Sequence, residues 1–356
     1  RDLHSFPTRR SSDLGGVLRN SEGKRFMFDD IPDNYKNQTA DNPEEGWRYT
    51  QGDKSARRPP ELLTRDHVAR CIMREVKAGR GSPHGGVFLD IAWIKEKLPN
   101  AAEHIKKKLP SMYHQFKQLA NVDITTEAME VGPTTHYVMG GIRVDGDSQM
   151  TNVPGLFAAG ECAAGLHGAN RLGGNSLSDL LVFGRRAGLY AAKFAKENGA
   201  GSVDAGQVSG IEQKALTPFE RSGKEGPYQV QEDLQESMQA LVGIVRNEGE
   251  MQEALQKVAE FKARASTVKV GGNREYNPGW HTALDLENLL TVTEAVARCA
   301  IERKESRGGH FREDFPDKDP ECAKWNSIVS RGSDGGMQLR REPIKELPAE
   351  LKAVIE

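Results

Sequence analysis

The fold of this chain is decided by one stretch, His167-Gly168-Ala169-Asn170-Arg171-Leu172-Gly173-Gly174-Asn175-Ser176-Leu177. An amphipathic helix is predicted from Ser176 to Lys196, because apolar and small residues recur there at helical spacing. The glycines before it leave backbone N–H groups unpaired beside the positive end of that helix. We expect its buried stripe to consist of Leu177, Leu180, Leu181, Gly184, Ala187, Gly188 and Ala191.

A short apolar strand is predicted just upstream, over residues 153–159, where it is closed by Gly160. The order of strand, glycine-rich loop and helix is how α/β proteins bind phosphates and cofactors. This part of the chain therefore predicts one piece of a cofactor-binding domain.

Three more segments could carry chemistry: Leu63-Thr64-Arg65-Asp66, Thr135-His136-Tyr137-Val138-Met139-Gly140-Gly141-Ile142 and Gly155-Leu156-Phe157-Ala158-Ala159-Gly160-Glu161-Cys162. Each also has an ordinary structural explanation. Arg65 and Asp66 at a helix start could form a surface ion pair, the His-Tyr pair could serve packing, and the Gly-Glu pair could be a turn.

The remaining patterns are mostly helical. Thr64 is a good N-cap for a helix with Val68, Ile72 and Val76 on one face, and Gly79 ends the run. A shorter helix is predicted over residues 91–98. Residues 202–227, rich in glycine, serine and charge, indicate a linker. Three amphipathic patterns follow, separated by short turns, and predict a small antiparallel bundle. The chain after residue 308 is predicted to be irregular.

Composition excludes some classes of protein. The 356 residues carry a formal net charge of −2, so no basic excess supports nucleic-acid binding. No apolar run is long enough to span a bilayer. The four cysteines form no CxxC pair, which predicts no metal site and indicates a reducing, cytosol-side compartment.

The first fourteen residues, RDLHSFPTRRSSDL, show no periodicity and stop at Gly15. A transit peptide is one interpretation, since the segment is rich in arginine and serine. We favour a non-native or artefactual leader, because a coherent pattern begins only at the glycine pair.

Taken in order, the four segments resemble the flavoprotein subunit of succinate dehydrogenase and fumarate reductase, from about Gly15 to about Asp319. The resemblance implies an α/β (α+β) chain with a partial FAD-binding Rossmann-like domain, a capping domain and a carboxyl-terminal three-helix bundle. The implied division is a capping domain at 15–135, the end of the FAD-binding domain at 136–200, a linker at 201–227, the bundle at 228–307 and an irregular region at 308–356.

The resemblance also implies roles for matching residues. Arg65 matches a proton-transferring arginine, and His136 and Arg171 match residues that bind a substrate carboxylate, so all three are expected to face one pocket. Glu161 matches the acidic residue that binds the ribityl or ribose part of FAD. The turn whose backbone lies at the flavin ring is matched by Asn175, Ser176 and Leu177.

The implied cofactor is FAD, and the implied substrate is a dicarboxylate, succinate or fumarate. The sequence has no GxGxxG motif and no flavin-linking histidine, so we expect the amino-terminal nucleotide-binding half, with any covalent attachment site, to be missing. The implied partners are an iron–sulfur subunit, and through it a membrane anchor subunit. The implied location is the cytoplasmic side of the inner membrane, peripheral through those partners.

Two other interpretations remain open. An L-aspartate oxidase-like enzyme would share Arg65, the His136-Tyr137 pair and the GANR sequence, but would carry a loop closer to MASNSL than to Leu172-Gly173-Gly174-Asn175-Ser176-Leu177. A non-catalytic flavoprotein-like module would be expected to lose Arg65, His136 or Arg171, and all three are present.

Overall fold

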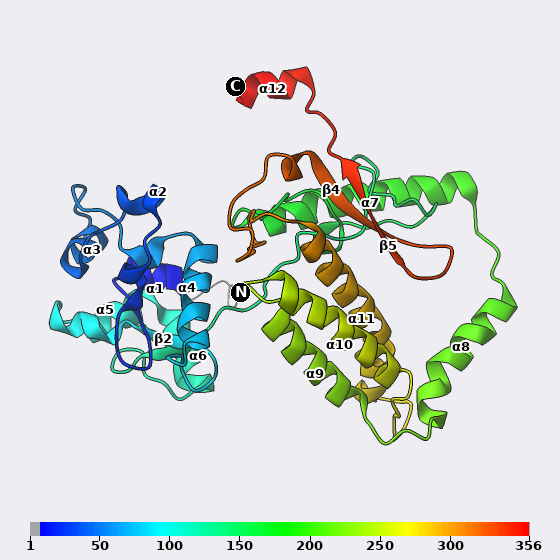
Figure 1. The fold of residues 1–356 in the computed structure, drawn as a ribbon, viewed down its shortest axis with the longest axis horizontal. Helices are drawn as coiled ribbons and strands as arrows, with labels where there is room; N and C mark the ends of the chain where they lie inside the picture. Colours follow the sequence, from blue (N-terminus) through cyan, green and yellow to red (C-terminus); the bar gives the residue numbers. More distant parts are fainter. Residues whose placement is uncertain (1–7, 356) are drawn as a thin grey trace. The chain divides into compact units, whose positions relative to one another are not determined.

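A computed structural model describes residues 8–355 of the chain, in two compact units that meet in sequence between Val138 and Met139 (Figure 1). Half of the segment that we expect to be a non-native leader, residues 1–7, lies outside the described residues. Residues 8–13 form a short helix in which Ser11 and Ser12 are buried. The foreign origin of this segment stays a prediction.

The first unit is built on a three-stranded antiparallel sheet in the order β1-β2-β3. The strands are β1 (Val17–Arg19), β2 (Val87–Asp90) and β3 (Met129–Val131), and Leu18 lies opposite Leu89 in the register. Around them lie α1 (Thr8–Asp13), η1 (Phe26–Asp29), α2 (Asp33–Lys36), α3 (Pro43–Thr50), η2 (Pro60–Leu62), α4 (Arg65–Lys77), η3 (Ala92–Glu96), α5 (Ala101–Lys108) and α6 (Pro110–Leu119). Their apolar side chains form one core.

The helix predicted after Thr64 is confirmed as α4. Val68 and Ile72 are buried on one face of it, as the spacing predicts, and Gly79 follows its end with a φ of +75°. Thr64 occupies the N-cap position, although its side chain makes no capping hydrogen bond. The helix predicted over residues 91–98 is wrong in type, since only the 3₁₀ turn η3 forms there.

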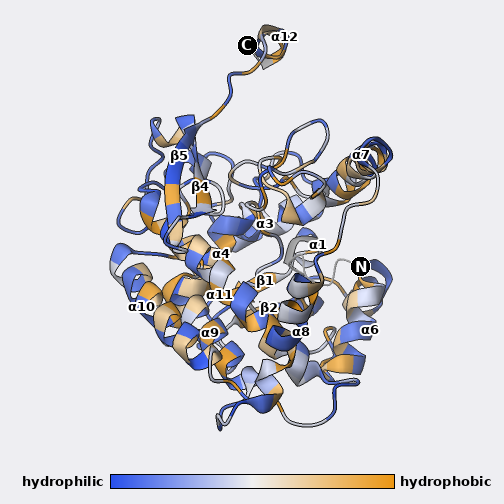
Figure 2. Cartoon of the chain, turned by 90° about the vertical axis from the view of Figure 1, so that its right-hand side faces the viewer, coloured by the Kyte–Doolittle hydropathy of each residue, from blue (hydrophilic) through white to orange (hydrophobic). Residues whose placement is uncertain are grey.

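In the second unit, α7 (Asn175–Asn198) confirms the long helix. The predicted buried stripe is wrong. Leu177, Leu180 and Leu181 are 68%, 49% and 76% exposed, because η4 (Gly160–Cys162) is the main element packed on α7 within the described chain. Apolar residues therefore stand along this helix, as the hydropathy colouring in Figure 2 shows.

The strand predicted over residues 153–159 is also wrong. Leu156 donates its N–H to the Val153 carbonyl at 3.1 Å, which closes a turn around Pro154 and Gly155. Proline followed by glycine at a positive φ, here +83°, is what a type II turn requires. Phe157 forms only an isolated bridge with Met150, so no continuous ladder forms.

Residues 205–220, expected within a linker, form α8 (Ala205–Glu220) instead. The helix begins where the Asp204 side chain accepts a hydrogen bond from the Gln207 N–H at 2.8 Å. The sequence interpretation missed this N-cap because the segment is rich in glycine and serine, which are typical of linkers.

The three-helix bundle is confirmed by α9 (Pro227–Leu241), α10 (Glu248–Ala265) and α11 (Pro278–Glu302), which lie side by side (Figure 1). Its core contains Val258, Leu286 and Leu290. Asn247 caps α10 by accepting a hydrogen bond from the Glu250 N–H at 2.9 Å. The apolar face of each helix is therefore buried against the other two.

The carboxyl-terminal region is less irregular than predicted. After η5 (Cys322–Lys324), strands β4 (Trp325–Arg331) and β5 (Met337–Pro343) form an antiparallel hairpin, and α12 (Ala349–Ile355) follows. Its turn contains Asp334 and Gly335, with a φ of +81° at the glycine. Asp-Gly between two extended runs is a strong hairpin indicator that the sequence interpretation overlooked. No helix in the described part of the chain is long and apolar enough to cross a membrane.

Candidate functional site

Arg65 is the first residue of α4, and its side chain is exposed. The predicted alternative, an ion pair with Asp66, is wrong. Asp66 pairs instead with Arg70, one turn along the helix, at 2.9 Å. Arg65 itself makes no hydrogen bond or ion pair with any other described residue. Its guanidinium is therefore available to a ligand.

His136 is exposed in an extended segment that follows β3 in the first unit. Arg171 belongs to the second unit, where its side chain is partly buried and donates to the Leu172 carbonyl at 3.4 Å. The expectation that Arg65, His136 and Arg171 face one pocket stays a prediction.

Within the second unit, the Gly140-Gly141-Ile142 segment lies beside η4. Ile142 donates its N–H to the Cys162 carbonyl at 2.7 Å, and Ala164 donates to the Ile142 carbonyl at 2.9 Å. A Cβ atom at Gly141 would approach the Cys162 carbonyl oxygen to 2.4 Å. The glycine is required for this close approach, which joins two of the four motifs found in the sequence.

The η4 turn in turn lies on α7. A Cβ atom at Gly160 would come within 2.4 Å of the Leu180 side chain, and the φ of Gly160 is +78°. Glu161, the next residue, has an exposed side chain. The structure thereby brings the predicted ribose-binding residue to the helix that begins with Asn175, Ser176 and Leu177.

The loop before α7 is fastened to it by a buried polar pair. His167 Nε2 lies 3.3 Å from the Asp179 carboxylate, and both side chains are at least nine-tenths buried. Sequence reasoning gave Asp179 no role. An acidic residue beside the leucines of an apolar helix face was the available indication, because a carboxylate buried there needs a partner.

The same loop is also contacted by residues 308–309, which follow the helical bundle. Gly309 donates its N–H to the Ala169 carbonyl at 3.1 Å. Gly308 has a φ of +61°, and a Cβ atom on it would lie 2.2 Å from that carbonyl oxygen. The Glu305-Ser306-Arg307-Gly308 segment and the glycine after it are thus in direct contact with the HGANR loop.

A buried charge network supports these glycines. Burial alone would raise the pKa of Glu305, but hydrogen bonds from Arg307 and Arg303 outweigh it and lower the pKa to about 2. His310 donates from Nε2 to the Arg303 carbonyl at 3.0 Å and accepts at Nδ1 from Arg246 at 2.9 Å. The neutral imidazole satisfies both contacts, and burial lowers the pKa of His310 to about 4.

The start of α7 suits a group with negative charge. Gly174, at the N-cap, has a φ of +88°, and no side chain caps the helix. The first backbone N–H groups of a helix of 24 residues therefore point outward from its positive end. Asn175, Ser176 and Leu177 are the residues there, as predicted, and the Leu177 side chain is exposed.

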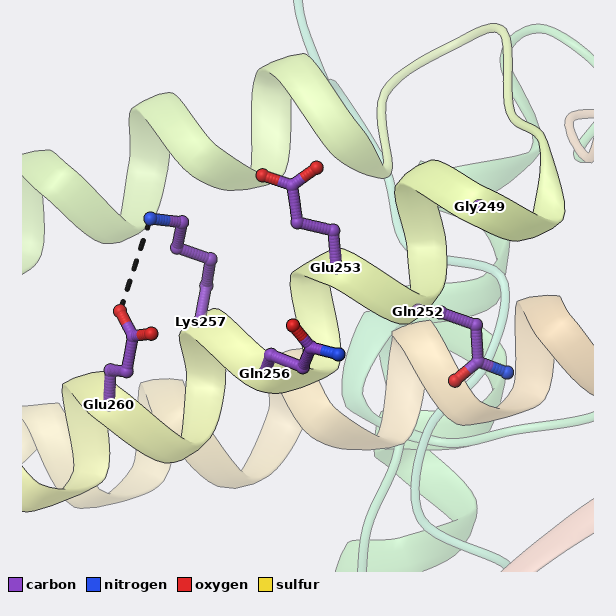
Figure 3. Close-up of a pocket in the computed structure, with 6 residues that line it drawn as sticks. All are labelled: Gly249, Gln252, Glu253, Gln256, Lys257 and Glu260. Carbon is purple, nitrogen blue, oxygen red and sulfur yellow. Dashed lines mark ion pairs between the residues drawn. The ribbon is translucent and has the colours of Figure 1, made fainter.

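A shallow hollow elsewhere contains none of these residues. It follows one face of α10, where Lys257 and Glu260 pair at 3.9 Å and the other lining residues are Gly249, Gln252, Glu253 and Gln256 (Figure 3). All six come from a single helix. We assign it no chemistry.

Comparison with known protein families shows first the class of protein and then the family to which the chain belongs. Residues 2–177 match the model of the FAD binding domain, and residues 231–353 match the model described as fumarate reductase flavoprotein C-term. The chain is therefore built as an FAD-dependent flavoprotein. It belongs to the family of succinate dehydrogenase and fumarate reductase flavoprotein subunits.

Individual relatives agree. The chain is 39% identical to one polypeptide of the fumarate reductase (CoM/CoB) of Methanothermobacter marburgensis, over 86% of this chain and 50% of that protein. It is 32% identical to the fumarate reductase flavoprotein subunit of Escherichia coli, over 93% of this chain and 53% of that protein. The solved structure of Mycobacterium smegmatis Sdh1 in complex with UQ1 superimposes with a TM-score of 0.80 at 48% identity, covering 97% of this chain and 54% of that one.

The expected fold class is confirmed by these matches. The chain spans about half the length of the curated relatives it matches.

Proposed function

We propose that this chain is the substrate-facing part of a flavoprotein subunit that interconverts succinate and fumarate with FAD. The observation that carries the proposal is Arg65, which stands exposed at the start of α4 and is uncommitted among the described residues. Family membership supplies the class of reaction.

In the proposed site, His136 and Arg171 bind a carboxylate of the substrate. A dicarboxylate carries two negative charges, and a guanidinium can donate two parallel hydrogen bonds to one carboxylate. The loop that carries Arg171 suits this task because two contacts just before Arg171 hold it, between His167 and Asp179 and between Ala169 and Gly309.

Arg65 is proposed to move the proton. One carbon of the substrate gains or loses a proton when the double bond is reduced or formed, and Arg65 would donate or accept it. An arginine that forms a structural ion pair would be a poor candidate, and Arg65 forms none among the described residues.

The described residues fit one end of FAD. The N–H groups of Ser176 and Leu177, at the uncapped start of α7, would face the flavin ring, and Glu161 would accept hydrogen bonds from ribityl or ribose hydroxyls. When bound, FAD would supply hydride transfer at its N5 atom.

The proposed partners are an iron–sulfur subunit, which would take the electrons, and a membrane anchor subunit reached through it. One related structure is a complex with UQ1 and another contains menaquinol molecules, which supports a quinone as the final partner. The proposed location is the cytoplasmic side of the inner membrane, where the protein would be peripheral.

The test replaces Arg65 by glutamine in a protein that joins this chain to the nucleotide-binding half of a longer relative. Glutamine cannot carry the proton, so we expect kcat for fumarate reduction to fall about a hundredfold to ten-thousandfold. FAD content and KM should change little, because His136 and Arg171 supply the binding charge. Steady-state kinetics measure kcat and KM, and the rate of flavin reduction by succinate checks the chemical step.

The matched control is Arg48→Gln, which removes another exposed arginine of the first unit, one paired with Asp53 at 3.2 Å. It should retain the parent's turnover. If Arg65→Gln stays within about tenfold of the parent, another group carries the proton. A parent protein with bound FAD that converts neither succinate nor fumarate would overturn the proposal as a whole.

A further inference from the structure

Three side chains of different chemistry converge in the first unit. Asp30 follows η1, and His67 and Cys71 lie one turn apart on α4. Cys71 Sγ is 3.3 Å from His67 Nε2 and 3.5 Å from Asp30 Oδ2, and one ligand atom from each residue lies within 4.8 Å of the others. His67 and Cys71 are only 3% and 4% exposed.

We propose that Asp30, His67 and Cys71 form a binding site for a divalent transition metal ion, with Zn²⁺ the best match. This inference is independent of the proposed function. Zinc bonds of about 2.0 Å to oxygen or nitrogen and about 2.3 Å to sulfur, arranged tetrahedrally, separate neighbouring ligand atoms by about 3.3–3.6 Å. The two distances from the sulfur lie in this range or at its edge.

The donor set selects the class of metal. A thiolate, an imidazole and a carboxylate together suit Zn²⁺ or Co²⁺, whereas Mg²⁺ and Ca²⁺ prefer oxygen ligands alone. Three protein ligands leave the fourth position to water. The cysteine spacing gave no indication of this site, because Asp30 and His67 are 37 residues apart and meet only through the fold.

Binding would exchange protons for the metal. In the structure, His67 Nε2 lies 2.7 Å from the Asp30 carbonyl and donates to it, and the Cys71 thiol donates to Asp30 Oδ2. A metal ion would displace the thiol proton to solvent and require the imidazole proton to sit on Nδ1. Arg74, which pairs with the Asp30 carboxylate, is half exposed and can turn toward water.

The site would join the residue after η1 to the first two turns of α4, the helix that begins at Arg65. A metal bound there would hold the two elements together, because one of its bonds would come from Asp30, just after η1, and two would come from α4. It would therefore stabilise the first unit.

The test is titration of the purified, reduced chain with Co²⁺ alone. We expect one equivalent to bind, with a near-ultraviolet band from thiolate-to-cobalt charge transfer and visible bands typical of four-coordinate Co²⁺. Zn²⁺ should abolish both by competition and should raise the midpoint of thermal unfolding. Cys71→Ser should remove the charge-transfer band, and His67→Gln should weaken Co²⁺ binding by more than the roughly tenfold to hundredfold that loss of an outer-shell partner costs.

Cys322→Ser is the matched control. Cys322 is also buried and also lies 3.5 Å from a carboxylate oxygen, that of Asp319, but no histidine in the described part of the chain completes the group there. It should leave the spectrum unchanged. If Cys71→Ser does not fold, Asp30→Asn provides the second measurement, since Asp30 is only partly buried. No Co²⁺ binding at micromolar concentration, or a charge-transfer band that survives in Cys71→Ser, would mean that the three residues form only a hydrogen-bonded cluster.

Discussion

Glu305 is fully buried, and two arginines donate to its carboxylate. Such a group would be costly alone, because a low-dielectric interior disfavours charge. Here the arginines outweigh the burial and keep the carboxylate ionised. The result is a rigid base for Gly308 and Gly309, which contact the HGANR loop.

His310 predicts how this base responds to acid. Burial holds its pKa near 4 in the folded protein, and Arg246, Arg312 and Arg303 add repulsion against a second proton. The unfolded chain, with a pKa of about 6.5, binds more protons between these values. The contribution of His310 to stability is therefore complete above about pH 6.5 and is lost as the pH falls toward 4, by about 3 kcal/mol at most.

Urea unfolding between pH 4 and 7 measures this slope. His310→Asn should flatten it, because asparagine can offer an acceptor and a donor without titrating. Carboxylates such as Glu305 and Asp314, whose folded pKa values are both about 2, contribute to acid sensitivity in the parent and the variant alike. Identical slopes in the two proteins would show that His310 takes up a proton as readily in the folded protein as in the unfolded chain.

Gly308 predicts a difference between two glycines of similar backbone conformation. Gly308 and Gly168 have φ values of +61° and +55°, so alanine at either position costs about 1 kcal/mol. A Cβ atom on Gly308 would clash with the Ala169 carbonyl, whereas one on Gly168 would have no described neighbour within 4 Å. We expect Gly308→Ala to lose about 1–3 kcal/mol more than Gly168→Ala in chemical unfolding. Equal losses would mean that the contact with Ala169 does not constrain the loop.

Among the elements, α11 carries one leucine that is buried in the bundle core and another that is exposed. Leu286 is 1% exposed and packs in the bundle core, whereas Leu289, on the same helix, is 37% exposed. Leu286→Ala should cost about 2–5 kcal/mol, since it removes buried apolar surface and leaves a cavity. Leu289→Ala should cost under about 1 kcal/mol. Thermal unfolding compares the pair, and similar losses would contradict the packing of the bundle.

The α7 helix has the opposite character. Its amino-terminal leucines are exposed although their spacing is that of a buried face. Periodicity reports which residues lie together on a helix, but it cannot report whether another element covers them.

At the scale of the whole molecule, we expect the chain by itself to bind FAD weakly and to be catalytically inactive. In the proposed site, the start of α7 and Glu161 would contact only the ring and sugar of FAD, and the sequence has no GxGxxG loop for the phosphates. Gel filtration of the chain mixed with FAD should separate protein from flavin. Adding the nucleotide-binding half of a longer relative should restore retention, and a yellow protein from the chain alone would contradict this expectation.

The sequence by itself determined five of the helices and the family. α4, α7 and the three bundle helices are long and periodic, so local patterning and caps specify them. The motifs indicated the family because they combine particular residue types at fixed spacing. These motifs contain Arg65, His136, Glu161, Arg171 and Asn175. The family assignment drawn from them is confirmed.

Only the tertiary structure decided which distant residues meet. Ala169 lies against Gly309, His167 pairs with Asp179, and Asp30 reaches His67 and Cys71 on α4. It also turned the predicted strand at Pro154-Gly155 into a turn and left the α7 leucines exposed. The reason is physical: a strand requires a neighbouring strand for its hydrogen bonds, and burial requires a covering surface, and neither is encoded in the local spacing of residues.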